Sequence, residues 1–202
     1  MKLCKLLLAS MGAAVLLGAL VASASARNFE VSNQRLRASF TNFEIHAPGV
    51  TTRCALTIEA SLQSRTMAKV AGSLIGYITR ADLGACTAST ATILTTTLPW
   101  HARYSGFSGT LPEISSIITH VIGFSFRFRG PGDIACLARS TTAEPLIVNY
   151  HRNTATRVLE AADIRGTMRT EAECLGISLS FRTDMGPLVG SPNGERVSVS
   201  LI

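Results

Sequence analysis

The 202-residue sequence predicts an all-β protein whose single domain is an antiparallel β-sandwich, and three observations lead to this prediction. Apolar and polar residues alternate in several segments, which places the apolar side chains on one face of a strand. Threonine, valine and isoleucine are frequent in those segments and suit a pleated surface. Turn residues separate many short strands, as in sandwiches and barrels. One-sided alternation favours two packed sheets, and a β-barrel is the alternative.

The N-terminus has the three parts of a secretory signal peptide. Lys2 and Lys5 are followed by the apolar run Leu6–Val21 and then by small residues. This run is shorter than the roughly 20 residues that span a bilayer. Small residues allow cleavage after Ala24 or after Ala26, and we prefer Ala26 because the new N-terminus is then polar. We therefore expect a signal peptide over residues 1–26 and a secreted or cell-surface domain.

The predicted mature domain, residues 27–202, is mildly basic. It has 17 basic residues against 13 acidic ones, a net charge of +4, and sixteen of the 17 are arginines without a run of three. This charge supports weak attraction to acidic surfaces such as cell-wall polymers. No later segment is long and apolar enough to cross a membrane, so no membrane contact is expected after signal cleavage.

Four segments carry the clearest alternation. The faces expected to be buried consist of Cys54, Leu56, Ile58, Ala60 and Leu62; of Ile118, His120, Ile122, Phe124, Phe126 and Phe128; of Leu175, Ile177, Leu179 and Phe181; and of Val197, Val199 and Leu201. Further strands are expected near residues 36–45, 72–80, 90–98, 100–107, 144–150 and 164–170. Residues 155–163 are predicted to form two turns of helix.

Turn residues delimit these strands. Ala47-Pro48-Gly49 follows the first strand, and Arg129–Asp133 ends the phenylalanine-rich one. Ser191-Pro192-Asn193-Gly194 precedes the last strand, and Asn-Gly is a strong hairpin signal. Because Arg127 and Arg129 alternate with the phenylalanines, the rings point inward and the arginines outward. A core strand explains this segment better than a nucleic-acid surface, and no nucleic-acid partner is expected.

Cysteine content indicates disulfides. Removal of the signal peptide leaves Cys54, Cys86, Cys136 and Cys174, and an even number in an exported chain favours disulfide pairs. Four cysteines allow three connectivities; we favour Cys54–Cys86 and Cys136–Cys174, which join neighbours in the chain. A zinc site is disfavoured because no C-x-x-C pair is present.

Residues 98–112, with the sequence LPWHARYSGFSGTLP, and the later strand Cys136-Leu137-Ala138 resemble a group of small exported β-rich proteins from high-GC soil bacteria. The resemblance covers about residues 70–140 and implies secretion and a β-rich domain. The group has no assigned activity, so the resemblance assigns no functional residue.

Catalytic, cofactor and metal-binding motifs are absent from the sequence. Gly106-Phe107-Ser108-Gly109 is one residue short of a nucleophile elbow and is interpreted as a turn. Trp100, His101 and Tyr104 are candidate binding residues, because an aromatic ring with polar neighbours can stack on a sugar. For Trp100 we favour the alternative interpretation, that it anchors the core, as large aromatic residues commonly do. His120 is interpreted as a core histidine, with a general base as the alternative.

Three functions remain open. The leading hypothesis is a secreted, non-enzymatic binding or surface-associated module with no cofactor, whose partner is a cell-wall polymer, a polysaccharide or a protein. The second is an extracellular hydrolase in which His101 or His120 works with a nearby carboxylate in a cleft. The third is a carrier of an apolar ligand, which needs a sizeable cavity between the sheets.

Overall fold

The computed structural model describes residues 28–87, 91–129, 135–170, 174 and 177–202. The predicted signal peptide lies outside the described residues, as does most of the predicted turn after Arg129. Within the described part of the chain, no helix has the length and apolar character of a membrane span.

Nearly all described residues lie in or between β-strands, and the all-β prediction is confirmed. The elements are β1 (Asn28–Val31), β2 (Arg35–Ala47), β3 (Val50–Leu62), β4 (Thr66–Ala68), β5 (Leu74–Cys86), β6 (Ala91–Ile93), the 3-10 turn η1 (Thr95–Thr97), β7 (Trp100–Thr110), β8 (Glu113–Ile122), β9 (Ser125–Arg129), β10 (Ala135–Arg139), β11 (Leu146–Arg152), β12 (Val158–Arg169), β13 (Ser178–Thr183), β14 (Gly186–Gly190) and β15 (Val197–Leu201).

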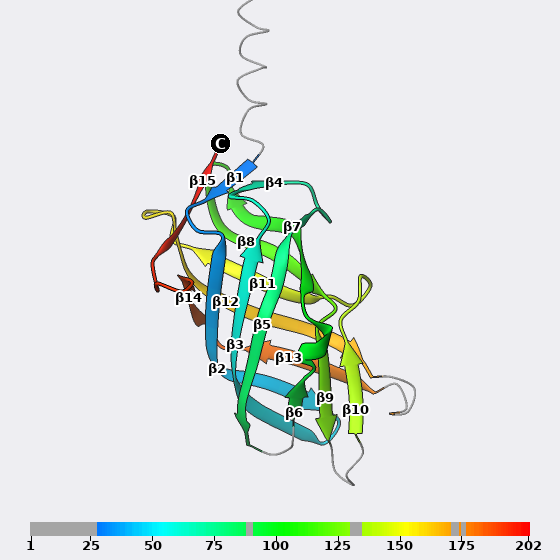
Figure 1. Ribbon diagram of the computed structural model, residues 1–202. Helices are drawn as coiled ribbons and strands as arrows, with labels where there is room; N and C mark the ends of the chain where they lie inside the picture. Colours follow the sequence, from blue (N-terminus) through cyan, green and yellow to red (C-terminus); the bar gives the residue numbers. More distant parts are fainter. Residues whose placement is uncertain (1–27, 88–90, 130–134, 171–173, 175–176) are drawn as a thin grey trace, which may run out of the picture.

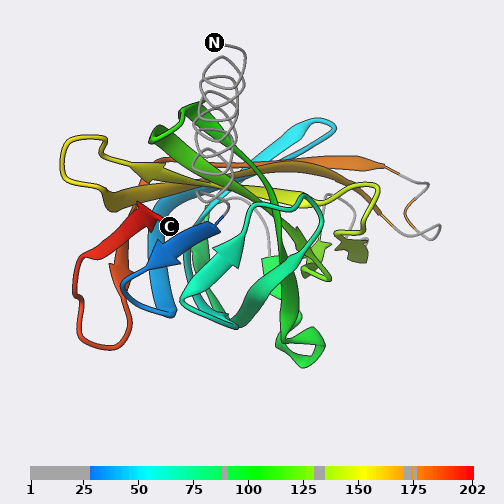
Figure 2. The same cartoon turned by 90° about the horizontal axis from the view of Figure 1, so that it is seen from above.

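The strands form one large antiparallel sheet and a small one. In the large sheet, pairing runs in the order β11-β8-β7-β5-β3-β2-β13-β12, and β12 also pairs with β11, so these eight strands form a closed ring (Figures 1 and 2). The small sheet has the order β10-β9-β6. The turn predicted at Ala47-Pro48-Gly49 joins β2 to β3 in a hairpin, where Gly49 has a φ of 77°.

Additional strands cover the end of the ring that is uppermost in Figure 1. There β1 pairs with β15 and β4, and the side chains of Phe29 and Val31 are buried. The buried Arg152 ties this cover to the ring, because its Nη1 donates to the Ile114 carbonyl at 2.9 Å and its Nε to the Val199 carbonyl at 3.2 Å. These two hydrogen bonds satisfy the Arg152 guanidinium group, whose positive charge would otherwise be costly to bury.

The small sheet lies toward the opposite end of the ring and contributes aromatic side chains to the same core (Figure 1). Phe126 of β9 and Phe124 just before it contact the rings of Phe43 and Phe181, with centroids 6.2–6.4 Å apart for Phe124 and 5.7–6.4 Å for Phe126. These edge-to-face contacts, with centroids in the favourable range for aromatic pairs, join the two sheets.

The interior of the ring is filled by side chains. Two internal spaces lined by apolar residues have volumes of about 20 and 10 Å³. A space of this size holds about one water molecule at most. These spaces therefore offer no room for an apolar ligand of the size that the carrier hypothesis requires.

The predicted turn at residues 106–109 lies within β7, and the strand expected near residues 90–98 is limited to β6, which is followed by η1. Two further details of the predicted secondary structure are wrong. Residues 155–163 form no helix: β12 begins at Val158, and its first residues pair with β11 on one side and with β15 and β14 on the other. Pairing on both sides outweighs a weak local helical pattern. The turn before it is organised by Asn153, whose Oδ1 accepts hydrogen bonds from the backbone N–H groups of Ala155 and Thr156 at 3.0 and 3.1 Å, an arrangement typical of Asx turns.

The second correction concerns the strand expected around His120. Gly123, with a φ of 95°, separates β8 from β9, and the alternation changes phase there. Thr119 and Val121 are consequently buried, while His120 points outward and is half-exposed. The phenylalanines of the next strand keep the predicted inward direction. Glycine permits this positive φ at little cost, whereas other residues adopt it rarely.

Both favoured disulfides are present, as the sequence predicted. Cys54–Cys86 joins β3 to β5, and Cys136–Cys174 joins β10 of the small sheet to the chain that precedes β13. The second disulfide is therefore a covalent link between the two sheets.

Candidate ligand-binding groove

The structure separates the three residues that the sequence proposed for binding. Trp100 is 1% exposed, and its Nε1 donates to Thr97 Oγ1 at 2.8 Å. Tyr104 is 3% exposed, while His101 reaches the surface beside the ring of Tyr77, with centroids 5.6 Å apart. A ring that protein atoms cover cannot stack on a sugar, so the position of Trp100 fits its interpretation as a core anchor.

The histidines named in the hydrolase hypothesis lack the geometry that it requires. Among the described residues, neither His101 nor His120 is hydrogen-bonded to a carboxylate. Asp163 instead accepts hydrogen bonds from His151, and from Asn149 Nδ2 at 3.1 Å. Among the described residues, no hydroxyl or thiol is hydrogen-bonded to His151.

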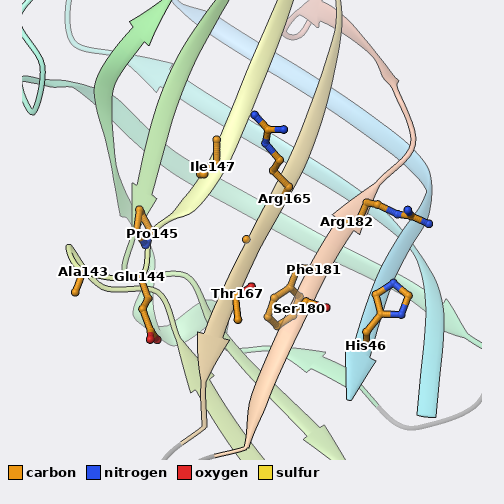
Figure 3. Close-up of a pocket in the computed structure, with 11 residues that line it drawn as sticks. His46, Ala143, Glu144, Pro145, Ile147, Arg165, Thr167, Ser180, Phe181 and Arg182 are labelled. Carbon is orange, nitrogen blue, oxygen red and sulfur yellow. The ribbon is translucent and has the colours of Figure 1, made fainter. Parts of the chain in front are cut away.

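A broad groove lies on the outer surface of the ring, over β12 and β13. Its volume is about 620 Å³. Figure 3 shows the loop with Ala143, Glu144 and Pro145 on one side and His46 and Arg182 on the other, with Thr167 and Ser180 between them. The residues that line it are His46, Ala143, Glu144, Pro145, Ile147, Arg165, Gly166, Thr167, Ser180, Phe181 and Arg182.

Strand register places charged groups of the groove in one row across the sheet. Arg165 of β12 is directly opposite Arg182 of β13, and Arg182 is opposite Glu44 of β2. Glu44 is in turn opposite Arg53 of β3. Residues directly opposite each other on antiparallel strands share a face and are in contact range, so the row presents three arginines and one carboxylate to solvent.

Glu44 is the only carboxylate in this row and is shared by two arginines, with a histidine beside it. Its Oε1 accepts from Arg53 Nε at 2.9 Å and its Oε2 from Arg182 Nη2 at 2.7 Å, while His46 Nε2 lies 3.2 Å away. The hydrogen bonds from Arg53 and Arg182 lower the pKa of Glu44 from 4.5 to about 2. By contrast, Arg165 makes no ion pair with any described residue, so none of those residues compensates its positive charge.

Glu144, the acidic residue on the side of the groove opposite Arg182, is paired with an arginine as well. Glu144 Oε1 lies 3.3 Å from Arg169 Nε, and Glu144 Oε2 accepts from the Arg169 backbone N–H at 3.1 Å. The Glu144 backbone N–H donates to Thr141 Oγ1 at 3.1 Å, which braces the loop. The groove therefore keeps a net positive charge, centred on Arg165 and Arg182.

We expect Glu44 to titrate near pH 2. Because its folded pKa lies below its ordinary value of 4.5, its contribution to stability is fully present above pH 4.5 and is lost as the pH falls from about 4.5 to about 2. Carboxyl-carbon NMR on the mature protein measures this pKa. In the Arg182→Gln variant the pKa should rise toward 4.5, and an ordinary pKa in the unmodified protein would contradict the ion-pair network.

The groove was not recognised in the sequence because its residues come from distant strands. His46, Arg165 and Arg182 approach one another only through the pairing of β2, β13 and β12. The available signal was weak: each arginine lies on the polar face of a strand, where a solvated charge is ordinary. Among the described residues, no group of three His, Cys, Asp or Glu side chains is placed to hold a metal ion.

Comparison with protein-family models, with curated proteins and with solved structures gave no match. The resemblance stated for residues 98–112 therefore stays a prediction. The two disulfides are compatible with an extracellular protein.

Proposed function

We propose that this chain is an extracellular, non-enzymatic binding module whose ligand lies in the groove over β12 and β13. The groove carries this proposal. Its volume of about 620 Å³ is within the range of about 300–1,000 Å³ usual for ligand sites. The strands beneath it belong to a closed ring with a filled core, so its side chains are held on rigid elements.

The other features support an extracellular role. Two disulfides suit an oxidising compartment, and the N-terminal residues have the pattern of a signal peptide. The groove supports the binding module over the two alternatives. The two internal spaces found among the described residues are too small for a carrier's ligand, and no hydroxyl or thiol of that part of the chain is hydrogen-bonded to the His151–Asp163 pair.

A pelleting assay tests the proposal. The oxidised mature protein, residues 27–202, is spun with purified cell walls and with several insoluble polysaccharides at low and high salt. We expect pelleting with at least one material, with part of the binding retained at high salt. In Thr167→Trp, an indole fills the groove and binding should fall by about tenfold, the equivalent of about 1.4 kcal/mol.

The control for that variant is Thr92→Trp, which changes an exposed threonine on β6 of the small sheet, away from the groove lining. It should pellet like the unmodified protein, and both variants should keep its unfolding temperature. Equal pelleting of the two tryptophan variants would place the ligand elsewhere. Absence of pelleting on every material would exclude binding to walls and to those polysaccharides.

A further inference from the structure

We propose that the ligand of the groove is an acidic polysaccharide whose carboxylates are bound by Arg165 and Arg182. This inference rests on the proposed function and adds the chemical class of the ligand. It is based on the facing arginine pair, on the hydroxyl groups beside it and on the burial of the nearby aromatic rings.

The arginine pair is unfavourable without an anion. Arg165 and Arg182 are directly opposite on β12 and β13, and like charges in that position repel each other. Glu44 offsets part of the charge of Arg182, but it is shared with Arg53. A carboxylate between Arg165 and Arg182 would relieve this repulsion. Arginine binds carboxylates through two parallel N–H···O hydrogen bonds, which adds strength and fixes orientation.

A second row, made of two hydroxyl side chains and a histidine, runs beside the charged row. Thr167 of β12 is opposite Ser180 of β13, and Ser180 is opposite His46 of β2. Each member lies two residues along its strand from a member of the charged row, a distance of about 6–7 Å on the same face. A sugar unit that carries both hydroxyls and a carboxylate has donors and acceptors for both rows, so a polyuronate fits this surface.

Other polyanions and lipids fit the groove less well. Single-stranded nucleic acids need exposed aromatic rings on which bases stack, yet Phe181 in the groove is 2% exposed. A lipid surface needs exposed apolar side chains, and the exposed large ones in the described part of the chain lie outside the groove. They are Val70, Leu111, Met185 and Ile202.

Calorimetric titration with two soluble oligosaccharides tests the ligand class. Polygalacturonate oligomers carry carboxylates, whereas fully methyl-esterified oligomers have the same backbone without the charge. We expect the oxidised mature protein to bind the acid form at least about tenfold more tightly, because arginine forms charge-assisted hydrogen bonds with a carboxylate but not with its methyl ester. Binding of the acid form should weaken as salt is raised.

Variants assign that difference to the arginines. Arg165→Gln and Arg182→Gln should each weaken binding of the acid form by about tenfold and leave the methyl ester unaffected. Arg127→Gln is the matched control, because Arg127 is an exposed arginine on β9 of the small sheet, and binding should be unchanged. Arg165→Lys should recover only part of the affinity, because an ammonium cannot make the paired hydrogen bonds.

Several outcomes would overturn the proposal. Equal affinity for acid and ester would show that the site binds neutral sugars. The proposal of a carboxylate ligand would then be wrong, while the proposed binding module would stand. If binding is unchanged in both arginine variants, Arg165 and Arg182 do not bind the ligand and the proposal is wrong. Tighter binding to a single-stranded oligonucleotide of similar charge would assign the groove to nucleic acid. If no uronate binds while wall pelleting still depends on Thr167, only the ligand class is wrong.

Discussion

Trp100→Ala is expected to destabilise the protein by about 3–5 kcal/mol, as large aromatic truncations in a core do. The indole is 1% exposed, and its ring meets that of Phe124 edge to face with centroids 4.9 Å apart. Its removal leaves a cavity beside the aromatic cluster and leaves Thr97 Oγ1 without its donor. For a domain of this size the unfolding temperature should fall by about 6–20 °C.

Thermal unfolding of the oxidised mature protein, followed by circular dichroism, measures this effect. Trp100→Phe keeps an aromatic ring and should cost about 1–3 kcal/mol. Val70→Ala is the control, since Val70 is 62% exposed and its truncation should change stability by less than about 0.5 kcal/mol. A Trp100→Ala protein of unchanged stability that no longer binds its ligand would instead make Trp100 a contact residue.

Loss of the Cys136–Cys174 disulfide, through the double variant Cys136→Ser and Cys174→Ser, is the second large effect expected. The cysteines are 38 residues apart in sequence. Closure of a loop of that length removes enough entropy from the unfolded chain to stabilise the fold by about 4 kcal/mol. The disulfide also joins the small sheet to the large one, so its loss should loosen β9 and β10 before the ring unfolds.

Urea unfolding and native-state hydrogen exchange measure these two consequences. Removal of Cys54–Cys86, 32 residues apart, should cost a similar free energy. It should not loosen the small sheet selectively, because both cysteines lie on paired strands of the ring. Equal exchange behaviour in the two double variants would show that the inter-sheet link has no local role.

Much of the architecture was predictable from local patterns. Alternation identified β3 and β15 with the correct faces, because a strand with one buried face must alternate. The Pro48-Gly49 turn and the strong turn residues Ser191–Gly194 delimited strands correctly. The preference for nearest-neighbour disulfides was also confirmed, although sequence left three connectivities open.

The failures have different origins. Two-sided pairing made residues 158–163 part of a strand rather than a helix, and this is not visible in a short window because it depends on which strands become neighbours. The outward position of His120 has a local origin, since the alternation changes phase at Gly123, where φ is 95°.

The sequence by itself determined the class of fold, the faces of several strands and the cysteines available for disulfides, because these follow from periodicity and composition. Tertiary structure alone decided that Arg165 and Arg182 face each other at one groove. The physical reason is register: a one-residue shift in pairing moves every side chain to the other face, and register depends on the whole sheet.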